Sequence, residues 1–269
     1  MATQVAKKED APLAVSLEDL TSFAGAGVEA VKKEDIAIPF INIIQSNSPQ
    51  ANKREGKYIE GAEIGMIFNS VTNEIFDGEK GIEVIPCAYK RELDEWIPRE
   101  QEGGFVSSHS IESTILSTTT KNEKGQDVLP NGNYLVNTAK HFVLLVGTKH
   151  GTVQCLLPMK GTQLKKSRRW NTQIMSQTLK LPDGSIKSYP SFAYAYTITT
   201  IPEKNSQGSW FGLEVSNQRP VTSEEFKLGA SFHGTVMSGA IDTAPREEQK
   251  EISEVCRKVF WPRSSLWNN

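Results

Sequence analysis

Apolar and polar positions alternate through the middle of the chain, in short runs separated by Gly, Asn and Pro. A period of two is typical of strands that bury one face, and the interrupting residues are typical of turns. From residue 36 to about residue 218 the pattern therefore predicts a mainly β domain. The candidate strands are Gly65–Val71, Ile82–Trp96, Tyr134–Val146, Thr152–Leu157, Ser191–Ile201 and Gly208–Val215. The Ser-, Thr-, Gly- and Asn-rich segment Gln101–Asn133 is expected to form a long hairpin or a mobile loop.

One segment inside this β region, Met159–Gln177, has a helical period instead. At 100° per residue its apolar side chains share an arc of roughly 160°. They are Met159, Leu164, Trp170, Ile174 and Met175. The opposite side carries Lys165, Lys166 and Arg169, with Arg168 at its border. The pattern predicts a helix that packs on a sheet by one side and presents cations on the other.

The chain ends are expected to differ from this central domain. Residues 1–35 are polar and predict a flexible arm with a short helix that begins near Ser16. Residues 36–220 form the predicted β domain. Residues 221–269 predict a helical C-terminal segment, with one helix over Ser223–Met237, capped by Thr222 or Ser223, and another over Arg246–Val259.

Composition narrows the class of protein. With 269 residues, 38% hydrophobic and 23% charged, the chain can bury a core and is neither fibrous nor wholly disordered. No apolar stretch is long enough for a membrane helix, and the first thirty residues do not resemble a secretory signal. We therefore expect a protein of the cytoplasm, with no membrane partner.

Charge is segregated along the chain, although the net charge is only -2. The segment Val128–Pro182 contains eight Lys and Arg and no Asp or Glu, so the remaining residues carry a net charge of -10. A surface of one sign attracts partners of the other sign, and nucleic acid is the commonest polyanion. A solvated basic face without a partner is the alternative interpretation.

The usual catalytic and metal-binding patterns are missing. Three dispersed cysteines and four dispersed histidines form no zinc site, and none of the common nucleotide, hydrolase or metalloprotease motifs occurs. The Glu248-Gln249-Lys250 triplet lacks the acidic strand of a metal-dependent nuclease. The cluster Glu92, Asp94 and Glu95 is interpreted as a solvated strand edge, and His141 as a sheet histidine. We expect no enzyme activity, no metal and no cofactor.

Binding is better supported, because basic groups and aromatic rings occur together on strands and helix. The cations expected to contact phosphates are Lys140, Lys160, Lys165, Lys166, Arg168 and Arg169. The candidate rings for stacking on bases are Trp170, Tyr194, Tyr196 and Trp210, and a place in the core is an open alternative for each of them. Phosphate contacts combined with stacking favour single strands over duplex, since duplex bases hide their faces.

A basic helix between strands is typical of an OB-type barrel, a common host of single-strand binding. We therefore expect an elaborated OB-like barrel with an inserted basic helix and extra terminal helices.

Several short segments within roughly residues 36 to 220 carry a resemblance to known proteins. They are Pro39–Gln45, Ser48–Pro49, Tyr58–Ala62, Asn69–Thr72, Val84–Tyr89, Met159–Lys165 and Trp170–Asn171. In these segments the sequence resembles a family of tailed-phage proteins of the replication module. The likeness to phage single-stranded DNA-binding proteins implies an OB fold, a role in DNA replication or recombination in the infected host cell, and replication proteins or a second copy as partners. One departure is the C-terminus, because such proteins usually end in an acidic tail whereas this chain ends in Trp267-Asn268-Asn269.

Single-stranded DNA binding is thus the function that the sequence predicts. The first alternative is a phage virion or assembly protein, in which the basic segment would contact a neighbouring subunit. An enzyme of nucleic-acid metabolism is the second.

Overall fold

The structure is a computed structural model that describes residues 16–31, 37–101, 103–123, 125–206, 208–239 and 241. The chain divides into two compact units after residue 36. The first unit contains the helix α1 (Leu17–Ser22), which begins where predicted because the Asp19 N–H donates to the Ser16 hydroxyl. The predicted helix over Arg246–Val259 lies outside the described residues.

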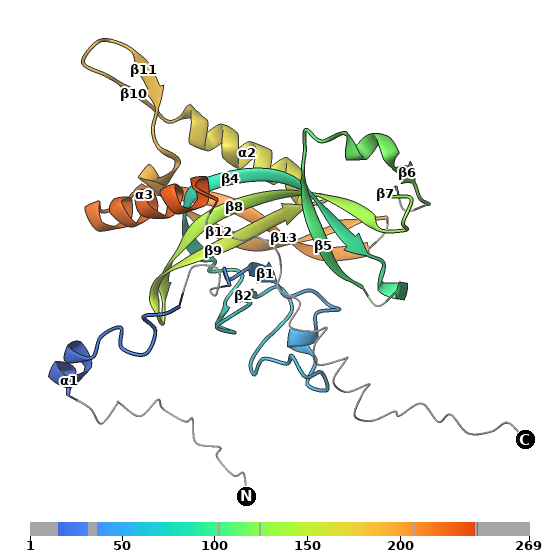
Figure 1. Cartoon of the computed structure of the whole chain (residues 1–269), viewed down its shortest axis with the longest axis horizontal. Coiled ribbons are helices and arrows are strands. Elements are labelled where there is room, and N and C mark those ends of the chain that lie inside the picture. The colour runs from blue at the N-terminus through green and yellow to red at the C-terminus, as the bar shows by residue number, and fades with distance from the viewer. Residues whose placement is uncertain are drawn as a thin grey trace, which may run out of the picture. The chain divides into compact units, whose positions relative to one another are not determined.

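The second unit is built on one curled antiparallel sheet of eight strands, a half-barrel that confirms the mainly β prediction (Figure 1). The order is β13-β12-β4-β8-β7-β6, with β5 also paired to β4 and β9 to β8. The strands are β4 (Ile82–Ile97), β5 (Gly104–Ser110), β6 (Thr120–Lys121), β7 (Asp127–Val128), β8 (Tyr134–Thr148), β9 (Gly151–Lys160), β12 (Tyr194–Asn205) and β13 (Gly208–Pro220).

An irregularity in the central strand β4 accompanies the curl of the sheet. The pairing register of β4 with β8 shifts between Pro86 and Ala88. A bulge of this kind bends a strand and increases its twist. It also exchanges the two faces, so Val84 before the shift and Tyr89 after it both point to the inner side of the curl.

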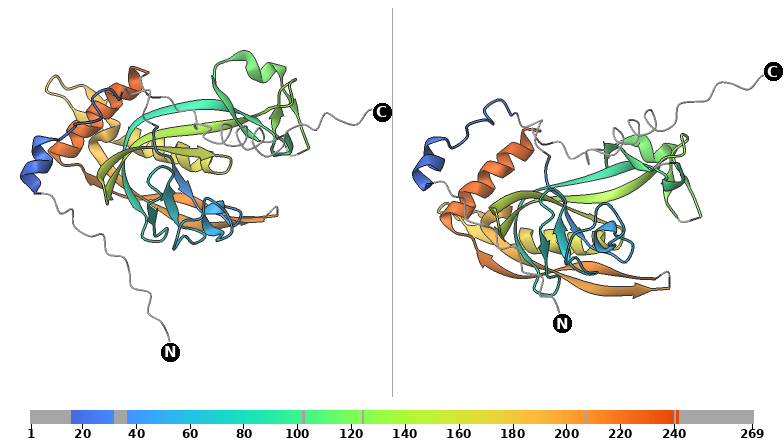
Figure 2. Two further views of the ribbon diagram at one scale, coloured as in Figure 1. Left: turned by 60° about the horizontal axis from the view of Figure 1, so that its bottom comes forward. Right: turned by 90° about the horizontal axis from the view of Figure 1, so that it is seen from below.

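The inner side of the curl holds the larger core, into which the helix α2 (Gln163–Ser176) packs (Figure 2). A small sheet of β1 (Ile41–Ile43), β2 (Ile67–Asn69) and β3 (Ile75–Phe76) contributes to the same core, and the short 3-10 helix η2 (Pro49–Ala51) lies between β1 and β2 in the chain. The buried apolar residues come from every layer and include Ile41, Ile67, Val84, Val143, Leu157, Met159, Trp170, Tyr196 and Leu213.

The outer side of the sheet is covered by the helix α3 (Ser223–Met237), together with the 3-10 helix η5 (Ser191–Ala193). Phe232 and Val236 of α3 pack on Ile85, Phe142 and other outward residues of the sheet. The helix has the predicted bounds, because Thr222 and Glu225 form a capping box at its start.

The described residues of the Gln101–Asn133 segment include β5, β6 and β7. The 3-10 helix η3 (Arg99–Gln101) leads into this segment and η4 (Thr114–Thr118) lies within it, and Leu93, Leu129 and Leu135 form a small core beneath it. A separate hairpin of β10 (Thr178–Lys180) and β11 (Ile186–Ser188) projects from the end of α2 (Figure 1). None of the helices in the described residues is long and apolar enough to cross a membrane.

Candidate nucleic-acid interface

The helix α2 begins later than its apolar pattern predicts, because Met159 and Lys160 are the last residues of β9. Met159 is fully buried in the inner core, so a strand position satisfies the same apolar residue. The buried side of α2 centres on Ser167 and Trp170, whereas Met175 is 69% exposed. The exposed arc is therefore wider than predicted and includes Arg168 as well as Lys165 and Arg169.

Two of the predicted stacking residues belong to the core. Trp170 and Tyr196 are each 1% exposed, and their rings meet edge to face with centroids 5.8 Å apart. A ring that is enclosed in this way cannot stack on a base at the surface, so the nucleic-acid roles predicted for Trp170 and Tyr196 are wrong. Their burial instead fixes α2 against the sheet.

His141 completes this anchor. Its ring stacks on Trp170 with centroids 4.5 Å apart, and its Nε2 lies 2.7 Å from the Ser167 hydroxyl. Both members of the Ser–His pair are 1% exposed, and burial lowers the pKa of His141 to about 3. A serine and histidine at hydrogen-bond distance can form a nucleophile and base, but this pair is sealed from solvent and holds α2 in place.

Lys140 was predicted to contact phosphate, and the structure places it elsewhere. Its side chain is 3% exposed, and its ammonium group forms ion pairs with Glu92 at 2.7 Å and Asp94 at 2.8 Å and donates a hydrogen bond to Ser108. The ligand role of Lys140 is therefore wrong, since the charge is already neutralised inside the sheet.

The same contacts correct the interpretation of the acidic cluster as a solvated edge. This half of β4 is paired with β5 on one side and β8 on the other, so it is not an edge. Glu92 and Asp94 share a face as predicted, while Glu95 on the other face contacts His109, Asn131 and Asn133. These three hydrogen bonds outweigh burial and lower the pKa of Glu95.

Lys160 is separated from the helix cations by strand alternation. Met159 points into the inner core, so Lys160, the next residue of β9, points to the opposite face. There its ammonium lies 5.6 Å from the centre of the Trp96 ring. Lys160 is exposed but does not share a surface with α2.

Lys166 and Trp210 converge on one carboxylate, that of Glu203 near the tip of β12. Lys166 forms an ion pair with Glu203, and the Trp210 indole N–H donates to it at 2.7 Å. The Gln163 side-chain amide lies 3.5 Å from the same carboxylate. Lys166 is thus half-buried and paired, unlike its neighbours on α2.

Three of the predicted cations remain at the surface together. Lys165, Arg168 and Arg169 are exposed, and none of them forms an ion pair with a carboxylate of the described residues. Lys180 and Lys187 of the β10–β11 hairpin, which follows α2 in the chain, are exposed as well.

Lys180 and Lys187 were absent from the predicted site. The signal that reveals them is local, because Asp183 at the hairpin turn is the only acidic residue between positions 160 and 190. We call Lys165, Arg168, Arg169, Lys180 and Lys187 the basic strip.

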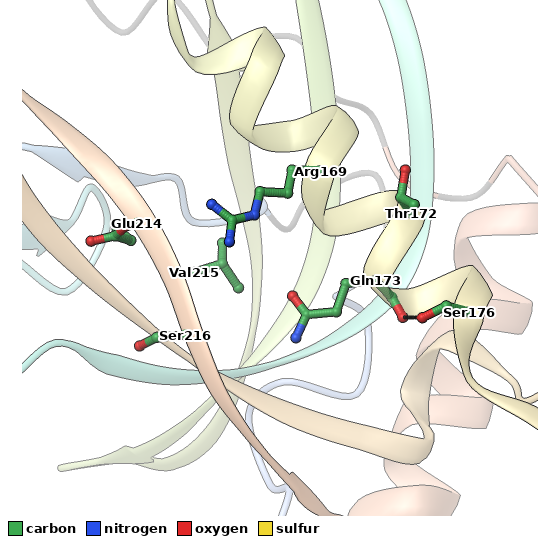
Figure 3. Close-up of a pocket in the computed structure, with 7 residues that line it drawn as sticks. All are labelled: Arg169, Thr172, Gln173, Ser176, Glu214, Val215 and Ser216. Atoms are coloured by element: carbon green, nitrogen blue, oxygen red, sulfur yellow. Dashed lines mark hydrogen bonds between the residues drawn. The ribbon is translucent and has the colours of Figure 1, made fainter.

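A groove of about 630 Å³ lies between α2 and β13, and Arg169 is the residue of the basic strip that lines it (Figure 3). The walls are Arg169, Thr172, Gln173 and Ser176 of α2 and Glu214, Val215 and Ser216 of β13. The Arg169 side chain extends from the helix toward β13 (Figure 3). The groove therefore offers a guanidinium, an amide and hydroxyls on the α2 side, and the Glu214 carboxylate on the β13 side.

The remaining predicted ring, Tyr194, lies near the end of the basic strip. It is half-buried and packs against the inner core, and Tyr189 meets it edge to face with centroids 5.8 Å apart. Tyr189, not predicted from the sequence, is 37% exposed. Tyr189, two residues after Lys187, is therefore the member of this pair that reaches the surface.

The described residues contain no group of three His, Cys, Asp or Glu side chains that could hold a metal ion. Cys87 and Cys155 are buried, and burial raises the pKa of each thiol to about 12. The triplet Glu248-Gln249-Lys250 lies outside the described residues.

Comparison with known proteins places the chain among phage proteins. Residues 7–242 match the family described as Pam3 phage gp34-like protein. No match was found among curated proteins or among solved structures. Because the matched residues cover most of the sequence, the chain belongs to this family.

Proposed function

We propose that this member of the Pam3 phage gp34-like family binds single-stranded DNA without sequence preference, in the replication or recombination of phage DNA. The observation that carries the proposal is the basic strip, in which exposed cations of α2 and the hairpin have no carboxylate partner among the described residues. Cations left free on one surface favour a polyanionic ligand, because each phosphate contact releases a counterion.

The tyrosine pair supports a single strand rather than a duplex. Tyr189 directly follows β11, the strand of Lys187, and packs against Tyr194; an exposed ring can stack on an unpaired base. Stacking of this kind is worth about 1 to 3 kcal/mol per base and needs no particular sequence. The arrangement combines phosphate contacts with a sequence-tolerant aromatic surface.

The arrangement of strands supports an OB-like barrel as part of the proposal. The long strands β4, β8, β9, β12 and β13 follow one another in the chain, and α2 lies between the third and the fourth. OB folds bind nucleic acid with the face of strands two and three and with the loops between strands one and two and between strands four and five. The loop between strands four and five corresponds here to the β12–β13 tip, which carries Lys204 and Trp210.

Titration of a fluorescent oligo-dT with the protein at a series of NaCl concentrations tests the proposal. We expect affinity to fall steeply with salt, and duplex DNA of the same length to bind more weakly. The triple variant Lys165→Ala, Arg168→Ala and Arg169→Ala removes three phosphate contacts, so the slope of log K against log salt should become shallower by about 2.

A matched triple variant controls for the loss of charge alone. Lys53→Ala, Lys149→Ala and Lys227→Ala removes three exposed lysines, two in turns and one in α3, and should leave the slope nearly unchanged. Equal effects of the two variants would remove α2 from the site. Self-association that does not depend on salt, without DNA binding, would instead favour a virion or assembly role.

A further inference from the structure

The carboxylate of Glu203 occupies an anion-binding position beside the basic strip. It accepts a hydrogen bond from the Trp210 indole N–H, lies near the Gln163 amide and neutralises Lys166. An ammonium, an indole N–H and an amide N–H are equally suited to a phosphate oxygen. The Glu203 carboxylate thus occupies hydrogen-bond donors that could otherwise bind a nucleic-acid phosphate.

The position is built into the backbone at Gly212. A Cβ atom at residue 212 would lie 2.6 Å from the Glu203 carboxyl carbon and 2.5 Å from the Gln163 amide nitrogen. Glycine therefore leaves room for both side chains in these positions, and a larger residue would require the end of Gln163 or Glu203 to shift. Gln163 is held in turn, since its Oε1 accepts the Leu213 N–H at 3.0 Å.

Glu203 lies where the basic strip meets the β12–β13 tip. Lys166 is adjacent in the chain to Lys165 and three residues before Arg169. Among the described residues of α2, Lys166 is the cation whose ammonium is paired with a carboxylate. Glu203 is 18% exposed as a side chain, which leaves it within reach of solvent and of a bound strand.

We propose that Glu203 limits the affinity of the basic strip for single-stranded DNA by holding Lys166 and Trp210 in competition with a phosphate group. This inference rests on the proposed function and adds its regulation. Single-stranded DNA that binds fully must displace the Glu203 carboxylate, whereas DNA that binds weakly leaves the ion pair between Lys166 and Glu203 intact. Affinity is thereby kept low enough for the protein to be released from DNA.

The variant Glu203→Gln tests the inference, because it keeps the shape and the acceptor for Trp210 and removes the charge. With the same oligo-dT titration we expect about fivefold tighter binding or more. One further phosphate contact should make the salt slope steeper by about 0.7. Glu63→Gln, an exposed residue of the loop before β2, makes the same change in net charge and should alter neither quantity.

A double-mutant cycle with Lys166→Gln assigns the effect to the ion pair. In the wild-type background Lys166→Gln should weaken binding slightly, because it leaves the Glu203 carboxylate without its cation. In the Glu203→Gln background the same substitution should abolish the gain. If Glu203→Gln does not fold, Glu203→Asp, which withdraws the carboxylate from Lys166, should give a smaller gain of the same sign.

The outcomes separate this inference from the proposed function. If the wild-type protein does not bind oligo-dT, the proposed function fails and the role of Glu203 fails with it. If the wild-type protein binds but Glu203→Gln and Glu63→Gln behave alike, Glu203 does not compete with phosphate and the DNA-binding function stands.

Discussion

His141 is a titratable group enclosed where the main sheet, α2 and β12 meet. Burial lowers its pKa to about 3, whereas an imidazole in an unfolded chain titrates near 6.5. Between these values the unfolded state binds a proton that the folded state excludes. The contribution of His141 to stability is therefore complete above about pH 6.5 and is lost as the pH falls toward 3.

We expect the free energy of unfolding of the wild-type protein to fall by about 2 kcal/mol between pH 7 and pH 5 through this group. His141→Gln keeps a polar partner for Ser167 and removes the titration, so its stability should change less over the same interval. Urea unfolding at the two pH values measures the difference. The interval lies above the range of Glu225, whose pKa Arg219 lowers to about 2.

An equal loss of stability in His141→Gln would assign the pH dependence to other groups.

The burial of this histidine also explains why residue type is a poor guide to the site. Trp170 and Tyr196 are as aromatic as Tyr189, yet they are enclosed by the same core that encloses His141. Which ring reaches solvent depends on packing between distant elements, and no local pattern reports it.

Among the elements, β13 lies at an open edge of the sheet, and side chains form hydrogen bonds with its outward main-chain groups. Gln45 acts like a neighbouring strand, because its amide accepts the Phe211 N–H at 2.9 Å and donates to the Phe211 carbonyl at 2.8 Å. Gln163 accepts the next outward N–H, that of Leu213. Unpaired strand edges promote pairing between molecules, so these two side chains protect the edge.

We expect Gln45→Ala to destabilise the protein by about 1 to 3 kcal/mol, because it leaves both main-chain groups of Phe211 unpaired. The uncovered edge should also increase concentration-dependent association, measured by light scattering of the native protein. Gln218→Ala, at an exposed position of the same strand, is the control. Unchanged stability and scattering in Gln45→Ala would show that water satisfies Phe211 equally well.

Element prediction succeeded where the signal is local. The bounds of α3 agree with its pattern because Thr222 and Glu225 cap it within one turn. The start of α2 was misplaced because a buried Met159 suits both a strand end and a helix face. The small sheet of β1, β2 and β3 has strands too short for period two to reveal their pairing.

At the scale of the molecule, the acid-free segment of the sequence indicated a basic surface but not which cations it contains. Lys140 lies in that segment, and its partner Glu92 is 48 residues away. Lys166 is neutralised by Glu203, which lies outside the segment. Folding thus neutralises Lys140 and Lys166 and places Lys160 on the opposite face of the sheet, so three of the six predicted cations are left on α2.

The buried thiols allow a test of whether the two cores of the second unit unfold together. Cys87 belongs to the outer core and Cys155 to the inner core, and burial raises both pKa values to about 12. A thiol reagent reacts with the thiolate, so neither cysteine should react in the native state. In a Cys256→Ser variant we expect labelling by a chromogenic disulfide to follow unfolding in urea.

Both thiols should then become reactive at the same urea concentration, as required if the two cores on opposite faces of the sheet unfold together. Reaction of Cys87 at lower urea than Cys155 would mean that α3 separates from the sheet first. Either result reports on the faces separately, because each face carries one cysteine.

The shift between Pro86 and Ala88 has a consequence for how the length of this chain can vary. Before the shift the even-numbered residues of β4 face the inner side of the sheet, and after it the odd-numbered residues do. The reason is that one residue of β4 has no partner on β8. Loss of a single codon at the shift would restore regular pairing and leave the later side chains on their present faces. The same deletion a few codons downstream would move Glu92, Asp94 and their neighbours to the opposite face of the sheet. Insertions and deletions should therefore be tolerated at the shift and not in the rest of the strand.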